Sequence, residues 1–169
     1  KYRLKGKTLF NEPKNGHTMA DEESPVSLLV LGGLGMVGRS FVKYVTDFGL
    51  AQHVRVVDKT IPVMAYLGDE FKAVMAHPTV EVVQANLGVA EHVERAFAAS
   101  EKCPHPFHLV VNLAAETRYG LPPETYKSIL ELRVLCAQQA ARVQVEKYVE
   151  VSTGQVYGGD TTYSGEPAP

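Results

Sequence analysis

Residues 27–38 read Ser-Leu-Leu-Val-Leu-Gly-Gly-Leu-Gly-Met-Val-Gly, an apolar run that passes into glycines at the spacing Gly32-x-x-Gly35-x-x-Gly38. Such a run is typical of a strand buried on both faces of a parallel sheet. The glycines allow a tight turn, close approach to a phosphate, and close packing of the next helix on the strand. That helix would turn its free amides and positive dipole end toward a pyrophosphate. A glycine triplet alone is equally consistent with a turn that binds nothing.

The residues after the glycines favour the binding interpretation. Apolar residues recur at helical spacing from Val37 to Phe48, and Gly49 is a plausible helix stop. The run His53-Val-Arg-Val-Val-Asp58 then predicts a second strand that ends in an acid. Asp58 follows Gly38 by 20 residues, close to where a carboxylate would hold the ribose hydroxyls of a dinucleotide.

Composition excludes several classes of protein. The chain has 169 residues, 45% hydrophobic and 21% charged, which is ordinary for one globular domain with a core. A net charge of −2 gives no reason to expect nucleic acid, and no apolar run reaches the ~20 residues that span a bilayer. Only Cys103 and Cys136 are present, so a disulfide framework is excluded and a reducing, cytoplasmic location is expected.

The chain divides into an extension and one domain. Residues 1–24 are basic and polar, with Met19 resembling a natural start, and we expect this extension to be poorly ordered. From residue 25 to 169 strands and helices alternate, which predicts a Rossmann-type three-layer αβα sandwich with a parallel sheet. Strands are predicted at 27–32, 54–58, 80–84, 107–113 and 147–152, and helices at 36–48, 63–76, 89–100 and 122–142.

Small and polar residues follow the later strands. Asn86 could contact an adenine edge or serve as a turn residue, and Ala114 and Ala115 could make room for a flat ligand or simply turn the chain. Ser152 and Thr153 could orient a substrate hydroxyl or cap the backbone. We expect no metal site, because the cysteine and histidines of residues 103–108 match no paired-ligand spacing.

Four motifs carry a resemblance to a known family. They are the glycine turn at 32–38, Asp58, Asn-Leu-Ala-Ala-Glu-Thr at 112–117, and Val-Ser-Thr-Gly-Gln-Val-Tyr-Gly at 151–158. In this order and spacing, over about residues 26–167, they resemble the amino-terminal part of an extended short-chain dehydrogenase/reductase of the NAD-dependent epimerase/dehydratase type.

The resemblance implies an NAD site, with Thr153 at the position of the family's catalytic Ser or Thr. It implies contact with the cofactor for a set of residues along the four motifs: Gly32, Gly35, Met36, Val37, Gly38, Asp58, Asn86, Leu87, Leu113, Ala114, Ala115, Thr117, Val151 and Ser152. Asp58 favours NAD because a carboxylate repels a 2′-phosphate, while Lys59 and Arg39 keep NADP compatible.

Three departures from the family pattern limit the expected chemistry. The family's catalytic Tyr-x-x-x-Lys is absent from residues 1–169, and Tyr163 is no substitute because Pro167 stands at the lysine position. Bulky residues occupy 128–133, where the family has Asn and a small Gly-Thr pair. Gly154 and Gln155 replace the Asp-Glu pair that sugar dehydratases use.

Two functions stay open at this point. The first is the NAD(H)-binding domain of an oxidoreductase or nucleotide-sugar epimerase that transfers hydride to or from a small hydroxy compound. The second is a non-catalytic Rossmann-fold subunit with a structural or sensing role. A homodimer or a larger assembly is compatible with either.

Overall fold

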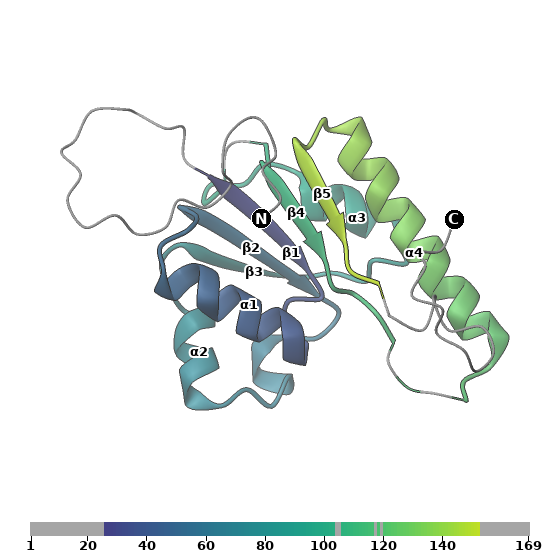
Figure 1. The fold of residues 1–169 in the computed structure, drawn as a ribbon, viewed down its shortest axis with the longest axis horizontal. Helices are drawn as coiled ribbons and strands as arrows, with labels where there is room; N and C mark the ends of the chain where they lie inside the picture. The colour runs from purple at the N-terminus through teal and green to yellow at the C-terminus, as the bar shows by residue number, and fades with distance from the viewer. Residues whose placement is uncertain (1–25, 104–105, 117, 119, 153–169) are drawn as a thin grey trace, which may run out of the picture.

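The strands form one parallel sheet. The computed structural model describes residues 26–103, 106–116, 118 and 120–152. Its five strands follow the order β3-β2-β1-β4-β5 (Figure 1), with all neighbouring pairs parallel. Their bounds are β1 Ser27–Leu31, β2 His53–Asp58, β3 Val80–Gln84, β4 Leu109–Asn112 and β5 Lys147–Glu150. This is the predicted Rossmann-like arrangement, in which the order reverses beside β1 and opens a crevice there.

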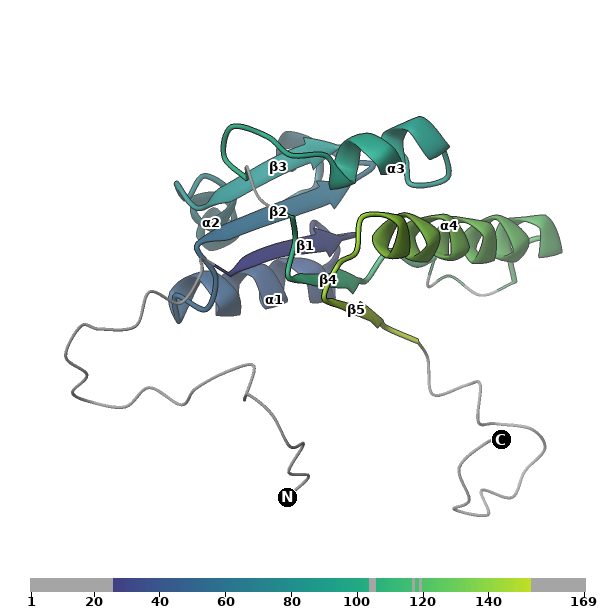
Figure 2. The same ribbon diagram turned by 90° about the horizontal axis from the view of Figure 1, so that it is seen from above.

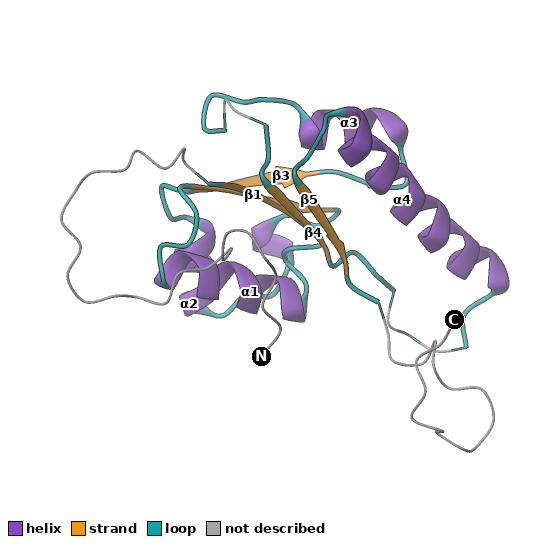
Figure 3. Ribbon diagram, turned by 45° about the horizontal axis from the view of Figure 1, so that its top comes forward, coloured by secondary structure: helices purple, strands orange, loops and turns teal. Residues whose placement is uncertain are grey.

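Helices cover both faces of the sheet. In Figure 3, α1 and α2 lie on one side of the strands and α3 and α4 on the other, giving the predicted three layers. Their bounds are α1 Met36–Asp47, α2 Asp69–Met75, α3 Ala90–Phe97 and α4 Pro123–Arg142, with a 3₁₀ turn η1 at Pro62–Met64. Figure 2 shows the strand arrowheads pointing toward the end of the molecule where α4 begins. Among the described residues, no helix has the length and apolar character needed to cross a membrane.

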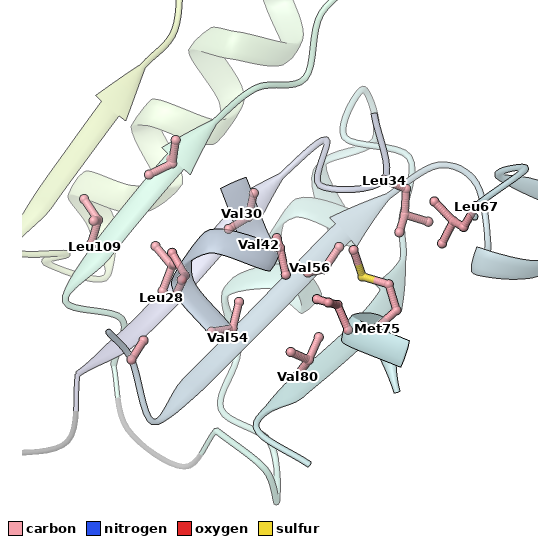
Figure 4. Packing of buried hydrophobic residues seen from close by; sticks show 14 residues of the cluster. Leu28, Val30, Leu34, Val42, Val54, Val56, Leu67, Met75, Val80 and Leu109 are labelled. Atoms are coloured by element: carbon pink, nitrogen blue, oxygen red, sulfur yellow. The ribbon is translucent and has the colours of Figure 1, made fainter. Parts of the chain in front are cut away.

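The core consists of two apolar layers divided by the sheet. On β1, Leu28 and Val30 face α1 and α2, while Leu29 and Leu31 face α3 and α4. Figure 4 shows the first layer, where Val42 of α1 packs among side chains of β1 and β2. All five of these side chains are at most 3% exposed, so the central strands have the apolar character that a doubly covered parallel sheet requires.

Arg55 is an exception to this apolar pattern. It is 2% exposed on β2, where its Nε donates to Glu81 Oε2 at 2.7 Å and its guanidinium lies 5.0 Å from the centre of the Phe107 ring. Nη1 donates to the carbonyls of Ala96, at 2.9 Å, and of Ala98. A cation at the carboxyl end of α3 is favoured by the helix dipole, so Arg55 ties α3 to the sheet.

The helix predicted at 63–76 is shorter than expected. The chain instead forms η1, takes a left-handed conformation at Tyr66 with φ 50°, and begins α2 only at Asp69 after Gly68. Pro62 fits the first turn of a short helix, and the positive φ at Tyr66 prevents that helix from continuing into α2. The other elements differ from their predicted bounds only at the ends, as for α3, which ends at Phe97 rather than residue 100.

Candidate functional site

The glycine turn packs backbone against backbone. Gly32 has φ +75°, and its N–H donates to Val57 O at 2.7 Å. A Cβ on Gly32 would lie 2.7 Å from Ala114 N, and a Cβ on Gly38 would lie 2.6 Å from Gly33 Cα. Real Cβ atoms do not approach other atoms this closely. The packing of the turn itself therefore requires glycine at both positions, whether or not a ligand binds.

A cavity of about 530 Å³ opens at the carboxyl ends of the strands, beside this turn. Its walls come from the turn and from the segments that follow β2, β3 and β4, with one side of α4 closing it. The lining residues that the sequence singled out are Gly32, Gly35, Asp58, Asn86, Leu87, Leu113, Ala114 and Ala115. The fold therefore gathers residues from four separate segments around one cavity.

Asp58 links the second strand to the glycine turn. Its Oδ2 accepts a hydrogen bond from Leu34 N–H at 3.1 Å, and its Oδ1 accepts one from Thr60 N–H at 3.1 Å. These two bonds fix the carboxylate at the cavity wall. Each carboxylate oxygen can accept a further hydrogen bond, so the group can receive two hydroxyls of a ligand.

Asn86 acts as a turn residue in this structure. Its Oδ1 accepts a hydrogen bond from Gly88 N–H at 3.1 Å, and its own N–H donates to His92 Nδ1 at 3.2 Å. Leu87, next to it, is 5% exposed and packs in the core layer against α3 and α4 while also reaching the cavity. Asn86 is therefore a turn residue, and because it also lines the cavity it can contact a ligand there.

An ion pair lies at the cavity wall beyond β4. Arg118 Nη2 donates to Glu116 Oε2 at 2.7 Å, and Arg118 Nε donates to Glu116 Oε1 at 3.0 Å. These side-chain bonds, helped by the Arg118 backbone amide, lower the pKa of Glu116 from 4.5 to about 2. Lys59, which also lines the cavity, acts in the same direction on that pKa. Glu116 is thus ionised throughout the neutral range.

Several predicted site residues lie elsewhere. Met36 and Val37 begin α1 and are 74% and 58% exposed, and Gly38 is buried beneath the turn; none of the three lines the cavity. Val151 and Ser152 are exposed just after β5 and are likewise not among the lining residues. Thr117 and Thr153 lie outside the described residues.

Other lining residues were not predicted as contacts. Met64 is the last residue of η1 and Ala65 follows it, and no motif in the sequence marks either residue. Thr125, Ser128, Ile129 and Leu132 of α4 also line the cavity. Their spacing of three, one and three residues puts them on one helix face, and this periodicity could have indicated them.

Comparison with known proteins places this site in context. The model of the NAD dependent epimerase/dehydratase family matches residues 28–168. A low-salt glycan biosynthesis protein from Haloferax volcanii is 25% identical over 140 residues, which are 79% of this chain and 41% of that protein. The chain thus spans about two fifths of the length of this curated relative.

Solved structures with the same fold include enzymes bound to NAD. The UDP-glucose 4-epimerase of Thermus thermophilus in complex with NAD is 26% identical, with a TM-score of 0.62, over 85% of this chain and 42% of that one. The dTDP-glucose 4,6-dehydratase of Bacillus anthracis in complex with NAD is 24% identical, with a TM-score of 0.64, over 85% and 44%. The uronate dehydrogenase of Agrobacterium tumefaciens is 21% identical, with a TM-score of 0.60, over 79% and 42%.

Proposed function

The chain belongs to the NAD-dependent epimerase/dehydratase family, and we propose that residues 25–169 form its NAD(H)-binding domain, with the cavity beside Gly32 as the cofactor site. The observation that carries this proposal is the position of Asp58. Its carboxylate stands at the end of β2, at the cavity wall, and is bonded to the amide of Leu34 in the glycine turn. A carboxylate so placed receives the hydroxyls of the adenosine ribose.

The amino end of α1 supports a pyrophosphate position. The residue before the helix is Gly35, which provides no side-chain cap, and the first turn contains no acidic residue. The first amides are therefore open to an anion, and the helix dipole favours one there. We propose that Met36 and Val37 contact the pyrophosphate through their backbone amides. Gly38 contributes indirectly, because its lack of a side chain lets the helix begin close to the turn.

The two halves of the dinucleotide then extend to opposite sides of β1. The adenine half lies over β2 and β3, beside Asn86 and Leu87, and the nicotinamide half lies over β4 and β5. On that second side we assign contacts to Leu113, Ala114 and Ala115, and also to Thr117, Val151 and Ser152.

NAD is the preferred cofactor in this proposal. The Asp58 carboxylate repels a 2′-phosphate, while Lys59 at the same wall would attract one. Arg39, the other cation considered for NADP, has its guanidinium 5.2 Å from the centre of the Phe71 ring. This contact with Phe71 of α2 holds the Arg39 side chain against α2, so Arg39 is less available to a 2′-phosphate.

The chemistry proposed for the whole protein is hydride transfer to or from a small hydroxy compound, such as a nucleotide sugar. The nicotinamide, when bound, supplies the hydride acceptor or donor. Thr153 would orient the substrate hydroxyl. We place this protein in the cytoplasm, as a homodimer or part of a larger assembly.

A non-catalytic nucleotide-binding subunit is the second candidate. Ile129 and Leu132 of α4 are bulky apolar residues that line the cavity. They favour this alternative because they narrow the space that a nicotinamide ring would occupy. NAD binding without any hydride transfer by the whole protein would support the subunit. NADH formation from a hydroxy substrate would support the enzyme.

Calorimetric titration with NAD, NADH and NADPH tests the cofactor site. We expect wild type to bind NAD, and Asp58→Ala to weaken NAD and NADH more than NADPH, because the 2′-phosphate of NADPH replaces one of the two ribose hydroxyls that the carboxylate would receive. Asp69→Ala is the control, since the Asp69 side chain is 98% exposed on α2. The proposal fails if wild type binds no dinucleotide at millimolar concentration. An equal loss of NAD and NADPH in Asp58→Ala would refute the ribose role.

A further inference from the structure

A polar network lies behind the cavity, on the side of the sheet that faces α4. Asn112 is fully buried at the end of β4, and its Oδ1 accepts a hydrogen bond from Ala114 N–H at 3.0 Å. Its Nδ2 donates to Glu150 Oε2 at 2.8 Å and to Tyr148 Oη at 3.1 Å. Both partners lie on β5, and Glu150 is the direct neighbour of Asn112 in the parallel pairing.

Glu150 is the acceptor on which the network converges. Tyr148 Oη also donates to Glu150 Oε2, at 3.0 Å, and Arg133 Nε of α4 lies 3.3 Å from Glu150 Oε1. The Arg133 contact is an ion pair without hydrogen-bond alignment, so Arg133 acts on Glu150 through its charge. Burial, with a further contribution from the Glu150 carboxylate, raises the pKa of Tyr148, so its hydroxyl stays a donor at neutral pH.

These contacts determine which way the Asn112 amide faces. An amide presents an acceptor on one side and donors on the other, so it can serve Ala114 N–H only while its NH₂ group faces acceptors. Glu150 and the Tyr148 hydroxyl are those acceptors on β5, and Glu150 also orients the hydroxyl by accepting its hydrogen bond. By accepting the Ala114 N–H, the Asn112 amide holds Ala114 against the glycine turn. The two segments are so close that a Cβ on Gly32 would lie 2.7 Å from Ala114 N.

The geometry points to Glu150 as a positioning residue for the cofactor: through Asn112 it holds Ala114 in place at the nicotinamide side of the cavity. This inference rests on the proposed NAD site. Glu150 does not line the cavity, and it acts only through Asn112 and the backbone of Ala114.

The position of the network predicts a selective effect on ligands. Ala114 follows β4, on the nicotinamide side of β1, whereas the adenine side is built by the segments after β2 and β3. Loss of the Glu150 acceptor should therefore weaken NAD and leave AMP almost unaffected. General destabilisation would instead weaken both ligands together.

The experiment compares Glu150→Leu with the conservative Glu150→Gln, whose carbonyl still accepts from Asn112. Glu94→Leu is the matched control, because Glu94 pairs with Arg142 of α4 at 3.0 Å on the surface and does not line the cavity. Calorimetry gives the affinities for NAD and AMP, and amide hydrogen exchange at Ala114 reports the same contact without any ligand.

For Glu150→Leu we expect NAD affinity to fall about tenfold, AMP affinity to change less than about twofold, and Ala114 exchange to accelerate. Glu150→Gln should stay within about threefold of wild type for NAD, and Glu94→Leu should match wild type. Unchanged NAD affinity in Glu150→Leu, or equal losses of NAD and AMP, would overturn the positioning role alone. Absence of any NAD or AMP binding by wild type would overturn the proposed function, and with it this role.

Discussion

Replacement of Gly32 by alanine tests whether the glycine turn is packed as tightly as the structure indicates. Two costs apply. An L-residue at φ +75° costs roughly 1–2 kcal/mol because its Cβ approaches the following carbonyl. The new Cβ would also lie 2.7 Å from Ala114 N and 2.8 Å from Ala114 Cα. Because both atoms belong to the backbone, no side-chain rotation relieves the contact, and overpacking of this kind costs about 1–3 kcal/mol.

Gly49→Ala is the matched control. Gly49 has φ +59°, close to that of Gly32, but a Cβ there would meet no atom within 4 Å. It should therefore lose only the roughly 1–2 kcal/mol of conformational strain. Gly32→Ala should lose about 2–5 kcal/mol in total.

Urea unfolding followed by far-UV circular dichroism measures both losses, and the chain contains no tryptophan for a fluorescence probe. If the two variants lose the same free energy of unfolding, the close packing of Gly32 against Ala114 is refuted. The turn would then require glycine for its conformation alone.

Three further predictions concern charged and ionisable groups. Arg55→Met should lower the free energy of unfolding by about 3–5 kcal/mol, because it leaves Glu81 and two carbonyls without their cation; a loss below about 1 kcal/mol in urea unfolding would contradict the network. By NMR titration Glu116 should have a pKa of about 2, and Arg118→Ala should return it toward 4.5. An unchanged Glu116 pKa in Arg118→Ala would refute the ion pair. Because the pKa of Glu116 is lower in the folded state than in the unfolded state, Glu116 stabilises the fold above about pH 4.5 and loses this effect as the pH falls toward 2. Burial raises the pKa of Cys136 from 9.0 to about 12. In a Cys103→Ser chain this thiol should react with a disulfide reagent at pH 8 only in urea, and rapid reaction of the folded variant would disprove its burial. The same shift means that Cys136 favours the folded state below about pH 9 and loses that effect as the pH rises toward 12.

Local patterns in the sequence were sufficient for much of the fold. Alternating apolar runs and glycines predicted all five strands, and the residues after β1, β2 and β4 were placed at one edge because parallel strands end together. The helix predicted at 63–76 was too long, because apolar spacing does not reveal the positive φ of Tyr66. α2 begins only after the left-handed conformation of Tyr66, and tyrosine rarely adopts that conformation, so the sequence does not indicate it.

Contacts between distant segments could not be predicted in the same way. Arg55 looks like an edge residue in an apolar strand, and its burial depends on Glu81, Phe107 and the end of α3, which are far away in the chain. Glu150 likewise has no local signal, since its importance comes from Asn112, 38 residues earlier. Such pairs become visible only once the strand order and register are known.

The most direct test of the cofactor site is an NMR titration of the ¹⁵N-labelled chain with NAD. We predict the largest amide shifts in the glycine turn, in the segment after Asp58, and at Ala114 and Ala115, all of which surround the cavity. Absence of shifts at millimolar NAD would contradict the proposed cofactor site. Shifts confined to the opposite edge of the sheet, near Ser27 and His108, would contradict it equally.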